Sequence, residues 1–206
     1  GEIIAALDST GVAVLNADDH LVAEMSTLHT GRVITFGTKG DVALAQPVTL
    51  NENGHANVVL EQDGEIWSVT VPQVGFHHGI NAAAAFAIAL GCGLEPRVIL
   101  AALASAEPRS RMRMEVVRTA GGTLILNDAY NANPESMNAG LETLVAVARA
   151  RSIAVLGPML ELGAESEAQH ERIGQRAREL GVDRVVVVGE IARPIARAAG
   201  DIAEYC

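Results

Sequence analysis

The sequence contains few lysines, aromatic residues and cysteines. Of its fifteen basic residues only Lys39 is a lysine, aromatic residues make up 3% of the chain, and Cys92 and Cys206 are its two cysteines. Two such cysteines form neither a disulfide framework nor a Cys-x-x-Cys motif, which is typical of proteins from a reducing compartment. We therefore expect a cytoplasmic protein.

Long apolar runs and an excess of positive charge are also missing. The longest apolar run, 82–92, is well short of the ~18 residues of a membrane span, and no secretory leader is recognisable. The formal net charge of −10 excludes a general binder of nucleic acid or of anionic membranes. It does not exclude a pocket for one nucleotide, so we expect small-molecule partners, with neither nucleic acid nor membrane among them.

What is present indicates a folded chain of two units. The 206 residues are 49% hydrophobic and 19% charged, which excludes a disordered or low-complexity protein. Residues 1–107 carry 3 basic and 12 acidic side chains, a net charge of −9, whereas residues 108–206 carry 12 and 13, a net charge of −1. This step predicts two domains, 1–107 and 108–206, that join at Glu107 and Pro108.

Residues 1–107 predict strands, an antiparallel meander and two helices. Apolar alternation, acidic first turns and the hairpin signals Asn-Glu-Asn-Gly and Gln-Asp-Gly define these elements. The expected elements are the end of a helix at 3–7, a strand at 12–16, a helix from the acids 18 and 19 to about 28, a strand at 32–37, the meander at 41–72, a buried helix at 79–90 ended by Gly91, and a helix from Pro96 with Ile99, Leu100 and Leu103 on one face.

Residues 108–206 predict a hairpin followed by alternating strands and helices. Such alternation implies a parallel sheet with right-handed crossovers, that is, a Rossmann-like α/β domain. The expected elements are a hairpin around residues 120–122, a helix capped by Asn133 with Pro134 in its first turn, a strand at 152–157, a helix with the capping box Ser166 and Gln169, a strand at 184–189 and a helix at 191–199.

The loop after the second hairpin strand carries the most informative polar side chains. Ligands of open α/β sheets bind at the carboxyl ends of strands, where Asp128 is expected. The loop residues Asn127, Asp128, Tyr130, Asn131 and Asn133 offer hydrogen bonds to hydroxyl groups or to a short peptide. The competing interpretation is that they cap the helix and satisfy the turn, which accounts for Asn133.

Three arginines, Arg109, Arg111 and Arg113, gather at the junction of the two units. A guanidinium group at a domain boundary can reach a phosphate or a ribose. The alternative is a solvated linker, since charge runs usually face water.

His77, His78 and Asn81 stand at the start of the helix predicted at 79–90. A helix N-terminus attracts anions, and a histidine with an asparagine can hydrogen-bond a nucleotide base. Capping and packing are the alternative, and no ligand spacing for a metal accompanies the histidines.

Three other positions are weaker candidates for a phosphate-binding or catalytic role. The segment 37–40 around Lys39 lacks the GxxxxGK[ST] pattern of a phosphate loop, and neither GxGxxG nor GxSxG occurs. Glu161 follows a strand and faces either a ligand or the next helix start. His170 is expected on the surface in the first turn of its helix.

The segments VLNADD, GFHHGINAAAA, RMRMEVV, LILNDAYNANPESM and VLGPMLELGAESEAQH follow one another along the chain. In this order they resemble the Mur ligases, the ATP-dependent amide-forming enzymes of peptidoglycan synthesis. The resemblance covers almost the whole chain. Its specific part resembles the branch of the family that adds D-alanyl-D-alanine to UDP-N-acetylmuramoyl-tripeptide. This specific part is NDAYNANPESM followed by MLELGAESEAQH.

The resemblance implies a domain plan and a reaction. Residues 1–107 resemble the latter part of the central ATPase domain, and 108–206 resemble the Rossmann-like C-terminal domain, which we expect to be truncated. ATP would phosphorylate the tripeptide carboxylate, and the dipeptide amine would attack the acyl phosphate. The resemblance also implies Mg²⁺ as cofactor, a monomer, a cytoplasmic location, and roles in cell wall biogenesis, cell shape and cell division.

The same resemblance assigns residues. It puts His77, Asn81, Arg113 and Asp128 at the nucleotide, and Tyr130, Asn131 and Asn133 at the dipeptide, with no catalytic residue and no metal ligand in the chain. Pro158 and His78 depart from the family pattern, and His78 puts the adenine contact in question. The family's phosphate loop and metal ligands are expected before Gly1, so the chain alone is predicted to be inactive.

Two alternatives remain open from sequence. The chain could be a non-enzymatic Rossmann-like binding module, or part of another Mur-like ligase of the folylpolyglutamate or cyanophycin type. An upstream GxxGK[ST] segment would favour a ligase, because that segment binds ATP phosphates.

Overall fold

A computed structural model of the chain describes residues 1–107 and 110–206, so Arg109 of the predicted arginine cluster lies outside the described residues. The chain divides into two units. Gly1–Asn51 and His55–Glu107 form the first, and Glu52–Gly54 with Pro108–Cys206 form the second. Each unit has its own hydrophobic core.

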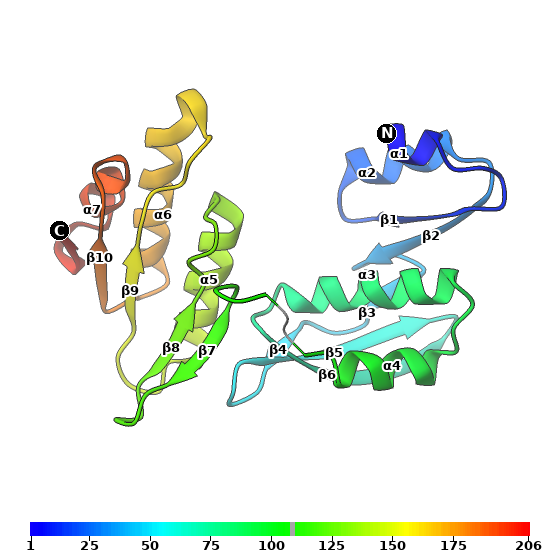
Figure 1. The fold of residues 1–206 in the computed structure, drawn as a ribbon, viewed down its shortest axis with the longest axis horizontal. Coiled ribbons are helices and arrows are strands. Elements are labelled where there is room, and N and C mark those ends of the chain that lie inside the picture. The colour runs from blue at the N-terminus through cyan, green and yellow to red at the C-terminus, as the bar shows by residue number, and fades with distance from the viewer. Residues whose placement is uncertain (108–109) are drawn as a thin grey trace. The chain divides into compact units, whose positions relative to one another are not determined.

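A mixed sheet forms the centre of the first unit (Figure 1). Its strand order is β1-β2-β3-β5, and β4 and β6 also pair with β5. The parallel pairs are β1–β2 and β2–β3, and the other pairs are antiparallel. The strands are β1 (Val12–Asn16), β2 (Arg32–Gly37), β3 (Val42–Leu44), β4 (Thr49–Leu50), β5 (His55–Gln62) and β6 (Glu65–Val74).

The predicted meander is confirmed in its hairpins but not in all its pairings. β4–β5 and β5–β6 are antiparallel neighbours, as their turn signals predict. β3, however, pairs with the last three residues of β5, while β4 pairs with Ala56 and Asn57 near its start. Because β6 occupies the opposite edge of β5, the two short strands β3 and β4 share one edge.

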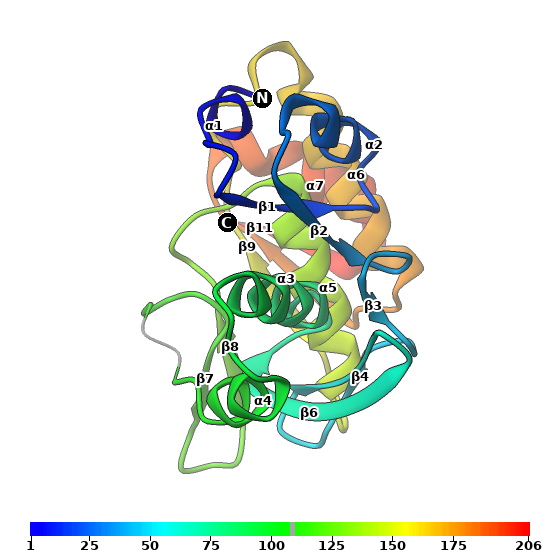
Figure 2. The same cartoon turned by 90° about the vertical axis from the view of Figure 1, so that its right-hand side faces the viewer.

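Two long helices, α3 (His78–Gly91) and α4 (Pro96–Ala104), lie side by side on the sheet of the first unit (Figure 2). Phe86 of α3 and Ile99 of α4 are buried in one core with residues of β5 and β6. The predicted buried helix α3 is buried only in part: Ala83, Phe86 and Ala87 are buried, whereas Ile88 is 54% exposed. Two shorter helices, α1 (Glu2–Ala5) and α2 (His20–Glu24), the latter continued by the 3₁₀ turn Met25–Leu28, accompany β1.

The second unit combines a hairpin with a three-stranded parallel sheet. The hairpin pairs β7 (Glu115–Arg118) with β8 (Leu124–Asn127). The parallel sheet has the order β11-β10-β9, with β9 (Ile153–Leu156), β10 (Arg184–Val187) and β11 (Ala203–Tyr205). The helices are α5 (Pro134–Val147), α6 (Ser166–Glu179) and α7 (Arg193–Ala199), with 3₁₀ turns at Gly163–Glu165, Glu190–Ala192 and Gly200–Ile202.

Successive side chains of the parallel strands point to opposite faces of the sheet, and the helices cover one of these faces. Ala154, Val185 and Val187 are buried among apolar residues of α5, α6 and α7. The next residues of β9 point the other way, and Ile153 and Val155 are 47% and 69% exposed. The predicted Rossmann-like pattern of alternating strands and helices is therefore confirmed, with its core on the helix-covered face.

A glycine allows α6 and α7 to pack closely. A Cβ atom on Gly174 would lie 2.3 Å from the carbonyl oxygen of Ile195 and 2.9 Å from the backbone nitrogen of Ala199. Real Cβ atoms do not come so near to backbone atoms. The contact between these two helices therefore requires a residue without a side chain at position 174.

The helix starts agree with prediction for α5 and disagree for α6. The side chain of Asn133 accepts a hydrogen bond from the Ser136 N–H (2.8 Å), and the Ser136 hydroxyl accepts one from the Asn133 N–H (3.1 Å). The capping box predicted at Ser166 is wrong: Ser166 is the first helical residue of α6, and the cap residue Glu165 makes no side-chain capping bond. A 3₁₀ turn at Gly163–Glu165 leads directly into the helix and replaces the cap.

His170 is fully buried, so the prediction of a surface residue is wrong. Its Nε2 accepts a hydrogen bond from the Met159 N–H at 2.9 Å, and its Nδ1 lies 2.6 Å from the Ser166 carbonyl oxygen. Because Nε2 accepts from an amide, Nδ1 must carry the proton and donate to that carbonyl. His170 thus ties the loop after β9 to the first turn of α6.

Candidate functional site

The first group of candidate residues lies at the start of α3. His77 precedes the helix and Asn81 lies one turn into it, with the Asn81 N–H 3.3 Å from the His77 carbonyl oxygen. Residues four apart lie on one face of a helix, so both side chains are presented together. Gly79 between them packs against Val48, where a Cβ atom would lie 2.1 Å from the Val48 Cγ2. A side chain at position 79 would therefore displace Val48, so a glycine lets the start of α3 lie close to the chain before β4.

His78 remains neutral near pH 7. Its ring centroid is 4.1 Å from that of His77, with the rings tilted by 43°. Burial, and secondarily the neighbouring His77, lowers the pKa of His78 to about 4. His78 therefore offers hydrogen-bonding groups rather than a positive charge near pH 7, which suits contact with a neutral base more than with a phosphate.

The second group is built around a carboxylate that holds a backbone segment. Asp128 directly follows β8, and its Oδ1 accepts a hydrogen bond from the Met114 N–H at 2.9 Å. Two residues later, the Tyr130 N–H donates to the Met112 carbonyl oxygen at 3.0 Å. These two bonds lay the loop 128–130 alongside residues 112–114.

Arg113 lies between two residues in an unusual backbone conformation. Met112 and Met114 have φ angles of 57° and 47°, in the left-handed region that residues other than glycine rarely adopt. The Arg113 guanidinium carbon lies 4.4 Å from the centroid of the Tyr130 ring, within the range of a cation–π contact. Both side chains are exposed. The structure therefore brings together three predicted site residues, Arg113, Asp128 and Tyr130.

The two asparagines of this loop are placed differently. The Asn133 side chain caps α5 through the Ser136 N–H, so its oxygen is already engaged. Asn131 is exposed on the loop between Tyr130 and the cap. The competing interpretation from sequence, that this loop satisfies a helix start, is therefore correct for Asn133.

The reason given from sequence for the position of Asp128 is wrong. β8 belongs to the two-stranded antiparallel hairpin with β7 and not to the parallel sheet. The rule that places ligands at the carboxyl ends of parallel strands therefore does not apply to it. The hydrogen bond to Met114, which no sequence pattern indicates, is what fixes the carboxylate.

The weaker candidates have structural explanations. In the segment around Lys39, the Thr38 N–H donates to the Asp18 carboxylate at 2.9 Å, and the Thr38 hydroxyl donates to it at 2.6 Å. A carboxylate therefore occupies the amide that a phosphate loop would offer to an anion. Glu161 is exposed and has a φ of 63° in the loop after β9.

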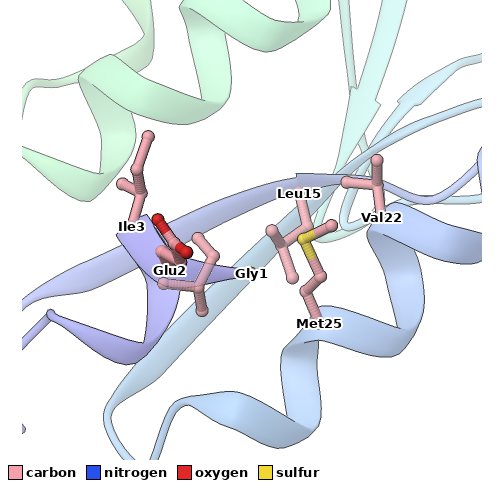
Figure 3. Close-up of a pocket in the computed structure, with 7 residues that line it drawn as sticks. Gly1, Glu2, Ile3, Leu15, Val22 and Met25 are labelled. Carbon is pink, nitrogen blue, oxygen red and sulfur yellow. The ribbon is translucent and has the colours of Figure 1, made fainter.

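A cavity of about 550 Å³ in the first unit involves none of the candidate residues. It opens between α1, β1 and α2, and Figure 3 shows Leu15, Val22 and Met25 on its wall opposite Ile3. Glu2 is the one charged residue of its lining. The lining has too few polar groups to recognise a nucleotide.

No metal centre forms among residues 1–107 and 110–206. In these ranges no three histidine, cysteine, aspartate or glutamate side chains come together as ligands. Within the same described residues, no helix is long and apolar enough to cross a membrane.

Comparisons with known proteins identify both units. Residues 1–89 match the Mur ligase middle domain, and residues 112–206 match the family described as "Mur ligase, glutamate ligase domain". The UDP-N-acetylmuramoyl-tripeptide–D-alanyl-D-alanine ligase of Mycobacterium tuberculosis is 43% identical over 195 residues, covering 91% of this chain and 38% of the relative.

Solved structures agree. MurF from Acinetobacter baumannii superposes with a TM-score of 0.89 at 29% identity, over 99% of this chain and 44% of that one. The MurF ligase from Thermotoga maritima, solved in complex with ADP, gives a TM-score of 0.83 at 26% identity, over 99% and 46%. The chain thus spans about two fifths of the length of these proteins. It belongs to the Mur ligase family, and its two units match parts of the family's middle domain and glutamate ligase domain.

Proposed function

We propose that this chain is part of an ATP-dependent ligase that joins D-alanyl-D-alanine to UDP-N-acetylmuramoyl-tripeptide in peptidoglycan synthesis. The observation that carries the proposal is the 43% identity to a relative of that name over 91% of the chain. Residues 1–107 are assigned to the latter part of the middle domain and residues 108–206 to a truncated C-terminal domain. The proposed protein is a cytoplasmic monomer without nucleic-acid partners.

The proposed reaction has two steps. The tripeptide carboxylate first takes the γ-phosphoryl group of ATP, which gives an acyl phosphate and ADP. The amine of the dipeptide then attacks the acyl carbon, and the tetrahedral intermediate collapses with release of phosphate. Positioning and neutralisation of phosphate charge are the main catalytic demands of the first step.

Arg113 and Asp128 are assigned to the nucleotide in this proposal. The Arg113 guanidinium opposes phosphate charge, and within the described ranges no carboxylate forms an ion pair with it. Asp128 uses Oδ1 for the Met114 amide. A carboxylate has about four lone-pair sites, so Asp128 keeps the capacity to accept a ribose hydroxyl.

The other candidates take the base and the dipeptide. His77 and Asn81, on one face of the α3 start, are assigned to hydrogen bonds with adenine. Asn131 and Asn133 are assigned to the dipeptide, although the cap role of Asn133 limits what its side chain can add. The sequence resemblance alone would place Tyr130 there as well.

Mg²⁺ is assigned to the parent enzyme, and among the described residues no three histidine, cysteine, aspartate or glutamate side chains come together as ligands. The sequence also lacks a GxxxxGK[ST] loop. We therefore assign neither metal binding nor phosphoryl transfer to residues of this chain. The chain by itself is expected not to release phosphate from ATP.

The test is an assay of the full-length protein with ATP, Mg²⁺, UDP-N-acetylmuramoyl-tripeptide and D-alanyl-D-alanine. Phosphate release that requires both the tripeptide and the dipeptide supports the proposal. Arg113→Ala is expected to lower kcat/KM for ATP, whereas Arg111→Ala, an exposed neighbour, serves as the matched control. Turnover with glutamate in place of the dipeptide would instead favour a folylpolyglutamate-type ligase, and no turnover with any amine would favour a binding module.

A further inference from the structure

The backbone around Arg113 is strained on both sides. Met112 and Met114 adopt left-handed φ angles, and neither is a residue type that tolerates this conformation well. Such residues persist only where the surrounding structure holds them, and they gather at functional sites. The segment 112–114 therefore needs specific partners.

Three hydrogen bonds supply those partners. The Met114 N–H donates to Asp128 Oδ1, and the Met112 carbonyl oxygen accepts from the Tyr130 N–H. The Met112 N–H also donates to Glu115 Oε2 at 3.1 Å. Both strained residues are thus held, and Arg113 between them is pointed in a fixed direction.

The Arg113 side chain lies against the ring of Tyr130. The ring centroid lies 4.4 Å from the Arg113 guanidinium carbon, and the ring is 60% exposed. Several other arginines, such as Arg176 and Arg197, form ion pairs with glutamates. Among the described residues no carboxylate does this for Arg113, so its charge stays available to an anion while the ring restricts its motion.

We propose that Tyr130 is a positioning residue: the face of its ring orients the Arg113 guanidinium for the phosphates of ATP, and its hydroxyl group makes no contact with the dipeptide. The functional part of this inference rests on the proposed function. It departs from the assignment that sequence resemblance gives, which puts Tyr130 at the dipeptide. It also explains why the loop carrying Tyr130 is hydrogen-bonded to the segment that carries Arg113.

A first measurement tests the contact without any activity. In the nuclear magnetic resonance spectrum of the chain, the ring current of Tyr130 should shift the Arg113 Hδ and Hε signals upfield. The signals are assigned with Arg113→Lys. Tyr130→Phe should keep the shift and Tyr130→Leu should abolish it, and equal spectra in Tyr130→Leu and wild type would overturn the proposal. Because Tyr130 is exposed, either replacement leaves the core intact.

A second measurement tests the role in the full-length enzyme. Tyr130→Leu is expected to raise the KM for ATP by about two- to fivefold, the range of an exposed cation–π contact, and to leave the KM for the dipeptide unchanged. Tyr130→Phe should behave as wild type. In a double-mutant cycle, Tyr130→Leu should add nothing further to Arg113→Ala.

The outcomes separate the two proposals. A raised KM for the dipeptide in Tyr130→Leu or Tyr130→Phe overturns the positioning role, because it would mean direct contact with that substrate. Additive effects of Tyr130→Leu and Arg113→Ala overturn it as well. A wild-type enzyme that forms no amide contradicts the proposed function, while the nuclear magnetic resonance test still decides whether the ring holds Arg113.

Discussion

The contact between α6 and α7 allows a quantitative test with an internal control. Gly174→Ala places a methyl group 2.3 Å from the carbonyl oxygen of Ile195 and 2.9 Å from the Ala198 Cβ. An ordinary contact would require the two helices to separate by roughly 1 Å. Gly140→Ala, in α5, adds the same methyl group where no atom lies within 4 Å.

The two substitutions share the same intrinsic helix preference. Replacing glycine by alanine inside a helix contributes about 0.8–1.0 kcal/mol, which should appear nearly undiminished at Gly140. At Gly174 the overpacking cost of about 1–3 kcal/mol outweighs this gain. We expect Gly140→Ala to stabilise the second unit and Gly174→Ala to destabilise it by up to about 2 kcal/mol, the difference between the two terms.

The assay separates the two units. Trp67, the only tryptophan, is in β6 of the first unit, so its fluorescence during urea unfolding reports that unit. Circular dichroism reports the unfolding of both units. For Gly174→Ala, the circular-dichroism transition of the second unit should move to lower urea, while the fluorescence transition of the first unit stays in place. A Gly174→Ala variant as stable as Gly140→Ala would refute the close approach of α6 and α7.

Three further predictions concern histidines and strained backbone. Because the folded-state pKa of His78 is about 4, below its unfolded value of about 6.5, the unfolded state binds more protons in this range, and stability falls as pH drops from 6.5 to 4. After allowance for partial exposure, the loss in the free energy of unfolding is about 1–2 kcal/mol. In His78→Gln the urea midpoints at pH 7 and pH 5 should converge, and an unchanged pH dependence in this variant would show that His78 is not its source. His170→Ala leaves the buried Met159 amide without its acceptor and opens a cavity, so calorimetry should show a loss of about 3 kcal/mol or more in the free energy of unfolding. A loss below about 1 kcal/mol would contradict the buried hydrogen bond between Met159 and His170. Met112→Gly relieves a left-handed φ at a 42% exposed side chain and should be neutral or stabilising in urea unfolding, whereas Met112→Val should destabilise by about 1 kcal/mol or more; the reverse order would argue against the left-handed conformation.

Sequence periodicity located most elements because it reflects burial directly. β1 and β2 occupy the predicted bounds, and the hairpins of β5–β6 and β7–β8 form at their glycine-containing turns. Turn signals identify which strands are joined, but not which edge a short strand chooses. For that reason the pairing of β3 with β5 could not be predicted.

The site was predicted as a set of residues and not as a geometry. Resemblance nominated Arg113 and Asp128, but the bond from the Met114 N–H to the carboxylate depends on a left-handed methionine. In a sequence, glycine, asparagine and aspartate indicate that left-handed conformation, because they adopt it most readily, whereas methionine does not. His170 was missed for a related reason, since its burial depends on how the loop carrying Met159 folds back onto α6.

The two oxygens of Asp128 are not equivalent, and this has a consequence for substitution at that position. One oxygen accepts from a backbone amide, so an asparagine there would turn its own carbonyl toward Met114 and its NH₂ group outward. The backbone segment would keep its shape while the outward atom changed from acceptor to donor. Asparagine at this position would therefore separate the architecture of the loop from whatever that outward oxygen recognises.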